Sequence, residues 1–208
     1  MTRNPKLLAI LIANIVPIQS GLPQDAPATQ LVWEQLSQIP AAQGKQTQPG
    51  VAGPFVGSHN GVVILAGGAN FPNGLPWEKG PKVYHKDVFV LSRQGETWEW
   101  RQSATSLPDP IGYGAMVSHS SGIICMGGEY KDPPIDGTQT RHLSDKVFSL
   151  KWVDDKVLID DTFPNLPKPM MGLVAARIGD VIYAAAGDSG NGPTTNFWSL
   201  DLSKRGGA

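Results

Sequence analysis

A repeat of about sixty residues, present three times, constrains the fold more than any other feature of this sequence. Each copy consists of a turn, an apolar strand and glycine at the end of that strand. The final glycines are Gly68, Gly128 and Gly187, which are 60 and 59 residues apart, and Ala186 replaces the first glycine of the third pair. Because glycine lacks a Cβ and tolerates positive φ, this recurrence predicts a sharp turn at a crowded place in every copy.

The rest of each repeat predicts further short strands. After the glycines we expect a long loop and then a third strand, at residues 86–91, 145–150 and 195–201. A fourth strand is expected at 97–101 and 156–160, followed by a proline-rich segment that leads into the next copy. Four strands per repeat with paired glycines are typical of the kelch blade of a β-propeller. The predicted fold class is therefore all-β, a kelch-type β-propeller.

The number of repeats predicts a partial propeller. We expect blades at about 53–103, 112–161 and 171–202, the third without its fourth strand. An apolar segment at about 31–37 is predicted to be a closing strand, which pairs with the last blade of a ring. Propellers have roughly four to eight blades. Residues 30–208 would thus need further blades, from the full-length chain or from a partner chain.

Composition agrees with this fold and argues against some partners. Glycine (24) and proline (18) are frequent among the 208 residues, and charged residues make up only 17%. This composition favours short strands joined by tight turns. The net charge is −1 and the basic residues are scattered, so no surface for nucleic acid or an anionic membrane is expected.

The first twenty residues are typical of a secretory signal peptide. Arg3 and Lys6 precede an apolar run at residues 7–16, which is too short for a membrane span of about twenty residues. We expect a periplasmic or secreted protein with no membrane association after cleavage; the alternative is an ordinary buried N-terminal segment. The single Cys125 lies in an apolar run without nearby metal-ligand spacing, so we expect it in the core.

Several segments resemble the sialic-acid mutarotase family, also called N-acetylneuraminate epimerases. They extend over residues 31–202 and include Gly50 to Gly61, Ala66 to Pro72, Trp77, Lys82-Val83-Tyr84, the strand from Asp87 to Leu91, Gly127-Gly128-Glu129 and Arg141. The resemblance implies an exported six-bladed kelch propeller that interconverts the α and β anomers of N-acetylneuraminate without a cofactor. On this basis the chain holds about three of an expected six blades, and its small-molecule partner is sialic acid.

The resemblance implies that Glu129 and Arg141 are the catalytic pair. Mutarotation of a cyclic hemiketal needs a base for the anomeric hydroxyl, an acid near the ring oxygen and a group that holds the carboxylate. Glu129 is expected to act as the base, with partial burial moving its pKa toward a useful value. Arg141 is expected to bind the substrate carboxylate through its planar fork. The alternatives are, for Glu129, a solvated loop glutamate or a partner of Lys131 and, for Arg141, a salt bridge between blades.

Three further residues are candidates for substrate binding: Asn70, His59 and Trp77. Asn70 follows the first glycine pair and is expected to present its amide to sugar hydroxyls, although asparagine is also common in turns. Trp77 lies in the long first loop, where an exposed aromatic ring suits carbohydrate. His59 begins a hairpin turn, and a structural role is the alternative. The four histidines lack metal-binding spacing, so no metal is predicted.

Two other function classes remain to be weighed. A non-catalytic kelch module that binds protein or glycan through its loops is compatible with the repeats alone. A copper oxidase of the kelch galactose-oxidase type needs a Tyr and His ligand set and a cysteine cross-linked to tyrosine. The apolar setting of Cys125 disfavours that chemistry.

Overall fold

The computed structural model describes residues 31–48 and 50–205. Residues up to 35 form a unit separate from the rest, and its described part, residues 31–35, has no regular secondary structure. All described strands lie in the second unit, which begins at Leu36. The predicted signal peptide at residues 1–20 lies outside the described residues, and export therefore stays a prediction.

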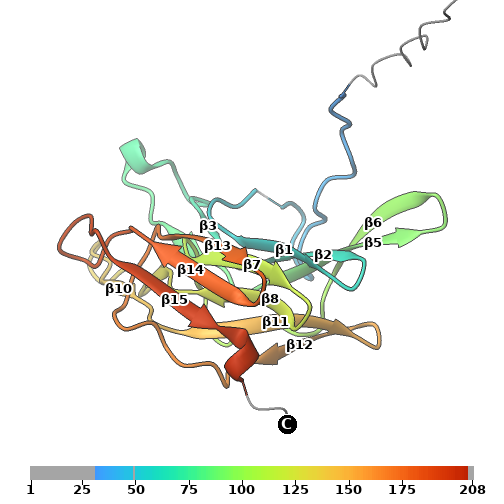
Figure 1. The fold of residues 1–208 in the computed structure, drawn as a ribbon. Helices are drawn as coiled ribbons and strands as arrows, with labels where there is room; N and C mark the ends of the chain where they lie inside the picture. The colour runs from blue at the N-terminus through green and yellow to red at the C-terminus, as the bar shows by residue number, and fades with distance from the viewer. Residues whose placement is uncertain (1–30, 49, 206–208) are drawn as a thin grey trace, which may run out of the picture. The chain divides into compact units, whose positions relative to one another are not determined.

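Three antiparallel sheets follow one another along the chain as blades (Figure 1). Blade 1 has the order β1 (Phe55–His59), β2 (Val62–Ala66), β5 (Val88–Gln94) and β6 (Thr97–Gln102). Blade 2 contains β7 (Ala115–His119), β8 (Gly122–Met126), β11 (Val147–Val153) and β12 (Lys156–Asp160) in that order. Blade 3 contains β13 (Val174–Ile178), β14 (Val181–Ala185) and β15 (Phe197–Asp201). The prediction of an all-β, partial propeller is confirmed.

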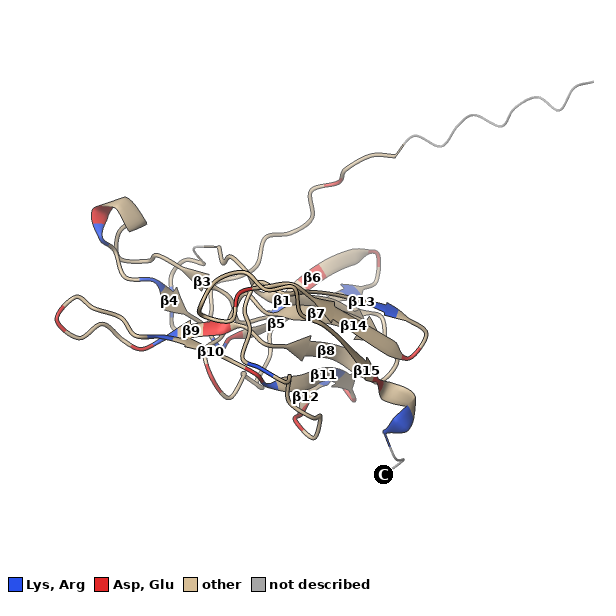
Figure 2. Cartoon of the chain, turned by 60° about the vertical axis from the view of Figure 1, so that its left-hand side comes forward, with Lys and Arg blue, Asp and Glu red and all other residues tan. Residues whose placement is uncertain are grey.

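Two short ribbons extend from the connections after the paired glycines. They are β3 (Ala69–Asn70) with β4 (Val83–Tyr84), and β9 (Glu129–Lys131) with β10 (Arg141–Leu143). Figure 2 shows both ribbons and their loops at one end of the blades, which we call the loop face. The tight turns at 59–62, 119–122 and 178–181 lie at the other end, the hairpin face.

Helix is confined to two single turns, η1 (Pro76–Glu78) and η2 (Leu202–Lys204), in the part of the chain that the structure describes. Neither is long enough to cross a membrane, and no other described segment is helical.

The blades are held together by apolar layers between neighbouring sheets. Phe55 of blade 1 packs edge-on against Phe148 of blade 2, with ring centroids 5.6 Å apart, in a layer that also contains Cys125. A second layer joins blades 2 and 3 around Met170 and Ile182. The core placement predicted for Cys125 is confirmed, because the side chain is fully buried and burial raises the pKa of its thiol.

The segment before blade 1 covers that blade without forming a strand. Ile39, Ala42 and Val51 pack against an apolar cluster of blade 1. Residues 31–37 are irregular. At the end of this segment, Ser37 is joined to the outer strand β6 by two hydrogen bonds of 3.1 Å. Residues 31–37 thus form no strand in the described structure; the closing strand was predicted to pair with the last blade of a ring, and that pairing stays a prediction.

A backbone ladder links the blades just before their innermost strands. Tyr113 N–H donates to Gly53 O, and Gly172 N–H donates to Tyr113 O, both at 2.7 Å. The three residues occupy the same position of the repeat and have φ values of 63°, 61° and 62° for Gly53, Tyr113 and Gly172. Left-handed backbone suits glycine, so the tyrosine of blade 2 is the exception.

The paired glycines approach the linker of the next blade closely. A Cβ on Gly127, which has a φ of 64°, would lie 2.6 Å from Met170 O. A Cβ on Gly67 would lie 2.3 Å from Ile111 O in the same way. Glycine is therefore required for both backbone conformation and space, which explains its recurrence in the repeat.

We expect Gly127→Ala to destabilise the protein by about 3 kcal/mol, because the methyl group meets a backbone carbonyl and the left-handed conformation disfavours alanine. Gly179→Ala is the matched control, since Gly179 has a φ of 58° and nothing lies within 4 Å of its Cβ position. The control should lose only about 1 kcal/mol. Urea unfolding measures both, and equal losses would show that the close approach contributes nothing.

Candidate functional site

The residue after each glycine pair occupies an equivalent place on the loop face. Ala69, Glu129 and Asp188 each form an antiparallel bridge with the residue that leads into the ladder. Side chains at this position project into the space where neighbouring blades meet. Two of the three blades place a carboxylate there.

A second repeated position carries positive charge. Lys82 lies just before β4, and Arg141 begins β10. Each contacts the carboxylate of the following blade, Lys82 with Glu129 and Arg141 with Asp188, and both pairs are 47 residues apart. The propeller repeat therefore generates a line of alternating charges from blade to blade.

Glu129 is the centre of this line. Its side chain is buried, and the residue is only 5% exposed. Lys82 Nζ and Tyr84 Oη donate to Oε1, the former at 3.2 Å, and Arg141 Nε donates to Oε2 at 2.6 Å. A buried carboxylate thus has one donor from its own blade and two from blade 1.

The donors determine the protonation states within the cluster. Burial acts to raise the pKa of Glu129, but the hydrogen bonds from Tyr84, Lys82 and Arg141 outweigh it and hold the pKa below its ordinary value. Partial burial was expected to bring this pKa toward the range of a useful base; the burial is present, but the net pKa is depressed. Burial and the hydrogen bond to Glu129 raise the pKa of Tyr84. Near neutral pH the pair consists of a carboxylate and a protonated phenol.

Arg141 joins blades 2 and 3. Besides its bond to Glu129, its Nη2 lies 3.4 Å from Asp188 Oδ2. Backbone N–H groups of Gly190 and Gly192 donate to Asp188 Oδ1 and, with Arg141, lower the pKa of Asp188. The salt bridge between blades, which the sequence left open, is present. Two nitrogens of the guanidinium are thus occupied by protein carboxylates, and Nη1 has no partner among the described residues.

Two aromatic rings and an amide fix Lys82. Its Nζ lies 3.9 Å from the ring centroid of Tyr113 and 5.1 Å from that of Tyr84. The Gln139 side chain accepts from the backbone N–H of Lys82 and donates to its carbonyl, at 3.1 and 2.9 Å. The lysine is therefore held by charge, by cation–π contact and by the loop of the next blade.

A cavity of about 510 Å³ lies between the two long loops of the loop face. It is lined by Lys79, Gly80, Pro81, Lys131, Pro134, Gly137 and Gln139. Gln139 connects it to the charged cluster, since the same side chain binds Lys82. Neither lysine of the lining has an ion-pair partner among the described residues, so this cavity favours anions.

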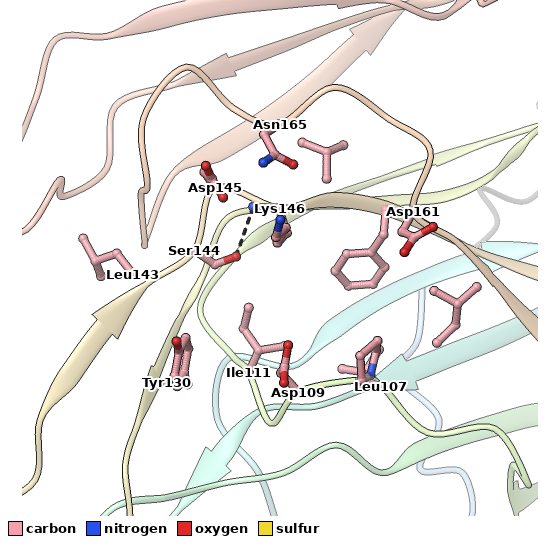
Figure 3. Close-up of a pocket in the computed structure, with 14 residues that line it drawn as sticks. Leu107, Asp109, Ile111, Tyr130, Leu143, Ser144, Asp145, Lys146, Asp161 and Asn165 are labelled. Carbon is pink, nitrogen blue, oxygen red and sulfur yellow. Dashed lines mark hydrogen bonds between the residues drawn. The ribbon is translucent and has the colours of Figure 1, made fainter.

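A second cavity, of about 370 Å³, lies beside blade 2 (Figure 3). Leu107, Ile111 and Phe148 are among its apolar walls, and Asp145 and Asn165 are at its polar side. Tyr130 lines this cavity while the adjacent Glu129 does not, because successive side chains of a strand point to opposite faces. The two cavities are thus separated by the β9–β10 ribbon.

The other sequence candidates lie in different places. Asn70 is on the loop face, where its Nδ2 donates to Gly50 O at 3.1 Å and its Oδ1 lies 2.9 Å from His85 Nε2. Trp77, in η1, is 78% exposed and lines neither cavity. Their roles in substrate binding stay predictions.

His59 is not brought to the cluster. It ends β1 at the hairpin face, about 13 Å along the strand from the loop-face end. Its Nδ1 accepts from Trp152 N–H at 2.9 Å, and its Nε2 lies 3.2 Å from Ser120 O. The ring joins blades 1 and 2, which is the structural alternative, and its role in substrate binding stays a prediction.

Four residues of the site were not singled out from the sequence: Lys82, Tyr84, Tyr113 and Asp188. The repeat contains a signal for three of them, because Lys82 aligns with Arg141, Asp188 with Glu129, and Tyr113 with Gly53 at offsets of 59 or 60 residues. Tyr84 has no such signal. No cluster of three or more His, Cys, Asp and Glu residues that could hold a metal occurs within residues 31–48 and 50–205.

Most of this site lies in a part of the chain that matches a known protein family. The family model described as N-acetylneuraminate epimerase matches residues 22–159. The N-acetylneuraminate epimerase of Pasteurella multocida (strain Pm70) is 35% identical over 133 residues, which cover 58% of this chain and 34% of the relative. That of Vibrio cholerae serotype O1 (strain ATCC 39315 / El Tor Inaba N16961) is 34% identical over 138 residues, covering 62% and 33%. The match thus spans about a third of these relatives.

The fold also resembles a solved structure. The protein of "Structure of YjhT" superimposes with a TM-score of 0.57 and 18% sequence identity, covering 76% of this chain and 45% of that one. At this identity the likeness concerns the fold. The sequence match contains Lys82, Tyr84, Glu129 and Arg141, whereas Asp188 lies beyond it.

We expect Glu129→Gln to destabilise the protein by about 2 to 3 kcal/mol at pH 7, because two cations lose their shared carboxylate and Arg141 is only partly buried. The pKa of Glu129 is depressed below its ordinary value of 4.5. The stabilisation is therefore complete above about pH 4.5 and is lost as the pH falls through the folded-state pKa.

Urea unfolding of both proteins between pH 3 and 7 measures this difference. The gap between wild type and variant should be constant above about pH 4.5 and should shrink below it. Glu96→Gln is the control, since Glu96 is exposed and pairs only with the nearby Arg93. A gap that widened toward low pH would contradict the depressed pKa.

Proposed function

Because the chain belongs to the N-acetylneuraminate epimerase family, we propose that its loop face binds N-acetylneuraminate and interconverts its α and β anomers. One observation carries this proposal: the family segment brings a carboxylate, a phenol and two cations together around Glu129. These groups match a reaction that moves a proton between two oxygens of an anionic sugar.

The positive groups support binding of the sugar carboxylate. Arg141 Nη1 has no partner among the described residues, and Lys79 and Lys131 line the adjacent cavity. A cavity with unpaired cations concentrates an anion and directs its carboxylate toward the guanidinium.

The Glu129–Tyr84 pair supports a proton relay. A carboxylate has about four acceptor sites, and three donors leave one for the anomeric hydroxyl. Glu129 accepts the hydroxyl proton while Tyr84 donates its proton to the ring oxygen, and the bond between that oxygen and the anomeric carbon breaks. In the same step the hydroxyl proton passes on from Glu129 to the Tyr84 oxygen through their hydrogen bond, which restores the carboxylate and the phenol. The carbonyl group of the open-chain sugar then rotates. The same proton transfers in the reverse direction close the ring on the other face of that carbonyl group and give the other anomer.

The relay explains how a carboxylate with a depressed pKa takes part. Alone, such a group is a weak general base. When Tyr84 releases its proton in the same step, neither a free phenolate nor a fully protonated carboxylate has to accumulate. The low pKa of Glu129 and the raised pKa of Tyr84 keep the resting pair in the protonation state that the relay requires.

We expect Tyr84→Phe to reduce anomerisation by about 100-fold or more while leaving sugar binding nearly unchanged, because it removes the relayed proton and no cation. The measurement is proton NMR of freshly released α-N-acetylneuraminate with the protein. Tyr183→Phe is the control, as this tyrosine stacks on Phe197 in blade 3. A folded wild-type chain that binds the sugar without accelerating anomerisation would instead favour the non-catalytic glycan-binding module.

We expect Lys131→Glu to weaken binding of N-acetylneuraminate several-fold, because it reverses one charge of the cavity. Binding by the wild type should also weaken as salt is raised, and the variant should lose part of that dependence. Lys156→Glu, at the hairpin face, is the matched control. Calorimetric titration at low and high salt measures both, and identical affinities of the two variants would exclude the cavity as the binding route.

A further inference from the structure

Tyr113 is a tyrosine at a backbone position where the other two blades have glycine. Its φ is 61°, a left-handed value that is uncommon for bulky side chains. Gly53 and Gly172 occupy the same place in blades 1 and 3 with almost the same φ. Since glycine forms the ladder in both neighbours, the ladder alone does not explain an aromatic residue in blade 2.

The surrounding structure holds Tyr113 in this conformation. Its N–H and carbonyl are both used in the ladder, at 2.7 Å to each neighbouring blade. Its ring lies directly on Gly53, where a Cβ would come within 2.7 Å of the ring carbon Cδ1. The absence of a side chain at Gly53 therefore leaves the space that the ring occupies.

That position places the ring at the edge of the charged cluster. The Lys82 ammonium lies 3.9 Å from the centroid of the Tyr113 ring. The Tyr84 ring packs edge-on against the Tyr113 ring, with the two ring centroids 6.3 Å apart. The Tyr113 hydroxyl has no hydrogen-bond partner among the described residues, and the side chain is only partly buried. A phenol with one face on a cation and a free hydroxyl is well suited to contact a ligand.

Strained residues that persist in a fold cluster at binding sites, where the strain serves function. We infer that Tyr113 contacts the bound acidic sugar: its hydroxyl hydrogen-bonds a sugar oxygen, and its ring fixes the Lys82 ammonium beside the carboxylate. Tyr113 is thus a further substrate-binding residue of the loop face. This inference rests on the proposed function of the loop face.

The test compares Tyr113→Phe and Tyr113→Gly with the wild-type chain by calorimetric titration of N-acetylneuraminate and by thermal unfolding. Tyr113→Phe should raise Kd about three- to tenfold without changing Tm, because it removes only the hydroxyl. Tyr113→Gly should raise Kd tenfold or more and change Tm by only a few degrees, because glycine suits the left-handed backbone while ring contacts are lost. Tyr183→Phe should leave both quantities unchanged.

The outcomes separate this inference from the proposed function. If the wild type binds the sugar and both variants bind equally well, Tyr113 is not a contact residue and only this inference fails. If Tyr113→Gly loses stability strongly and the folded fraction keeps its affinity, the ring is structural and the inference again fails. If the folded wild type binds no N-acetylneuraminate, the proposed function fails, and this inference fails as well because it rests on that function.

Discussion

The close approach of each glycine turn to the linker of the next blade is the constraint on which the rest of the structure depends. At Gly127 a Cβ would lie 2.6 Å from Met170 O, so two backbones meet where no side chain fits. The turn fixes the direction of the strand that follows it, and the bridge from Glu129 to Gly112 then fixes the position of the next residue. The backbone geometry between blades thus determines the position of Glu129 independently of its side-chain interactions.

The same positions repeat, and the charged cluster follows from that repetition. A cation before β4 or within β10 meets the carboxylate of the following blade, with the same separation of 47 residues in both pairs. Blade 2 has Glu129 where blade 1 has Ala69 and blade 3 has Asp188, and it has Tyr113 where both other blades have glycine. The asymmetry that a binding site needs therefore arises from substitutions within a symmetric scaffold.

How much was predictable from the sequence follows from the same geometry. The blades were predictable because glycine turns and apolar strands recur at fixed spacing, and Glu129 and Arg141 came from the family resemblance. Asn70 lies close after the first glycine pair, as Glu129 does after the second, but the register shows that Ala69 is the equivalent of Glu129. A shift of one residue in a strand moves a side chain to the other face. His59 lies at a hairpin turn as expected, but the sequence does not show that its ring bridges two blades through Trp152 and Ser120.

The pKa of Glu129 was beyond sequence reasoning because it depends on donors from another blade. Burial alone would raise it, and only the convergence of Lys82, Tyr84 and Arg141 reverses the direction. Two of those donors come from blade 1, so the protonation state of the carboxylate depends on how blade 1 packs against blade 2. A change that separates these blades would weaken the ion pairs and raise the pKa together. Blade packing and the acid–base character of the site are therefore one property of this fold, not two.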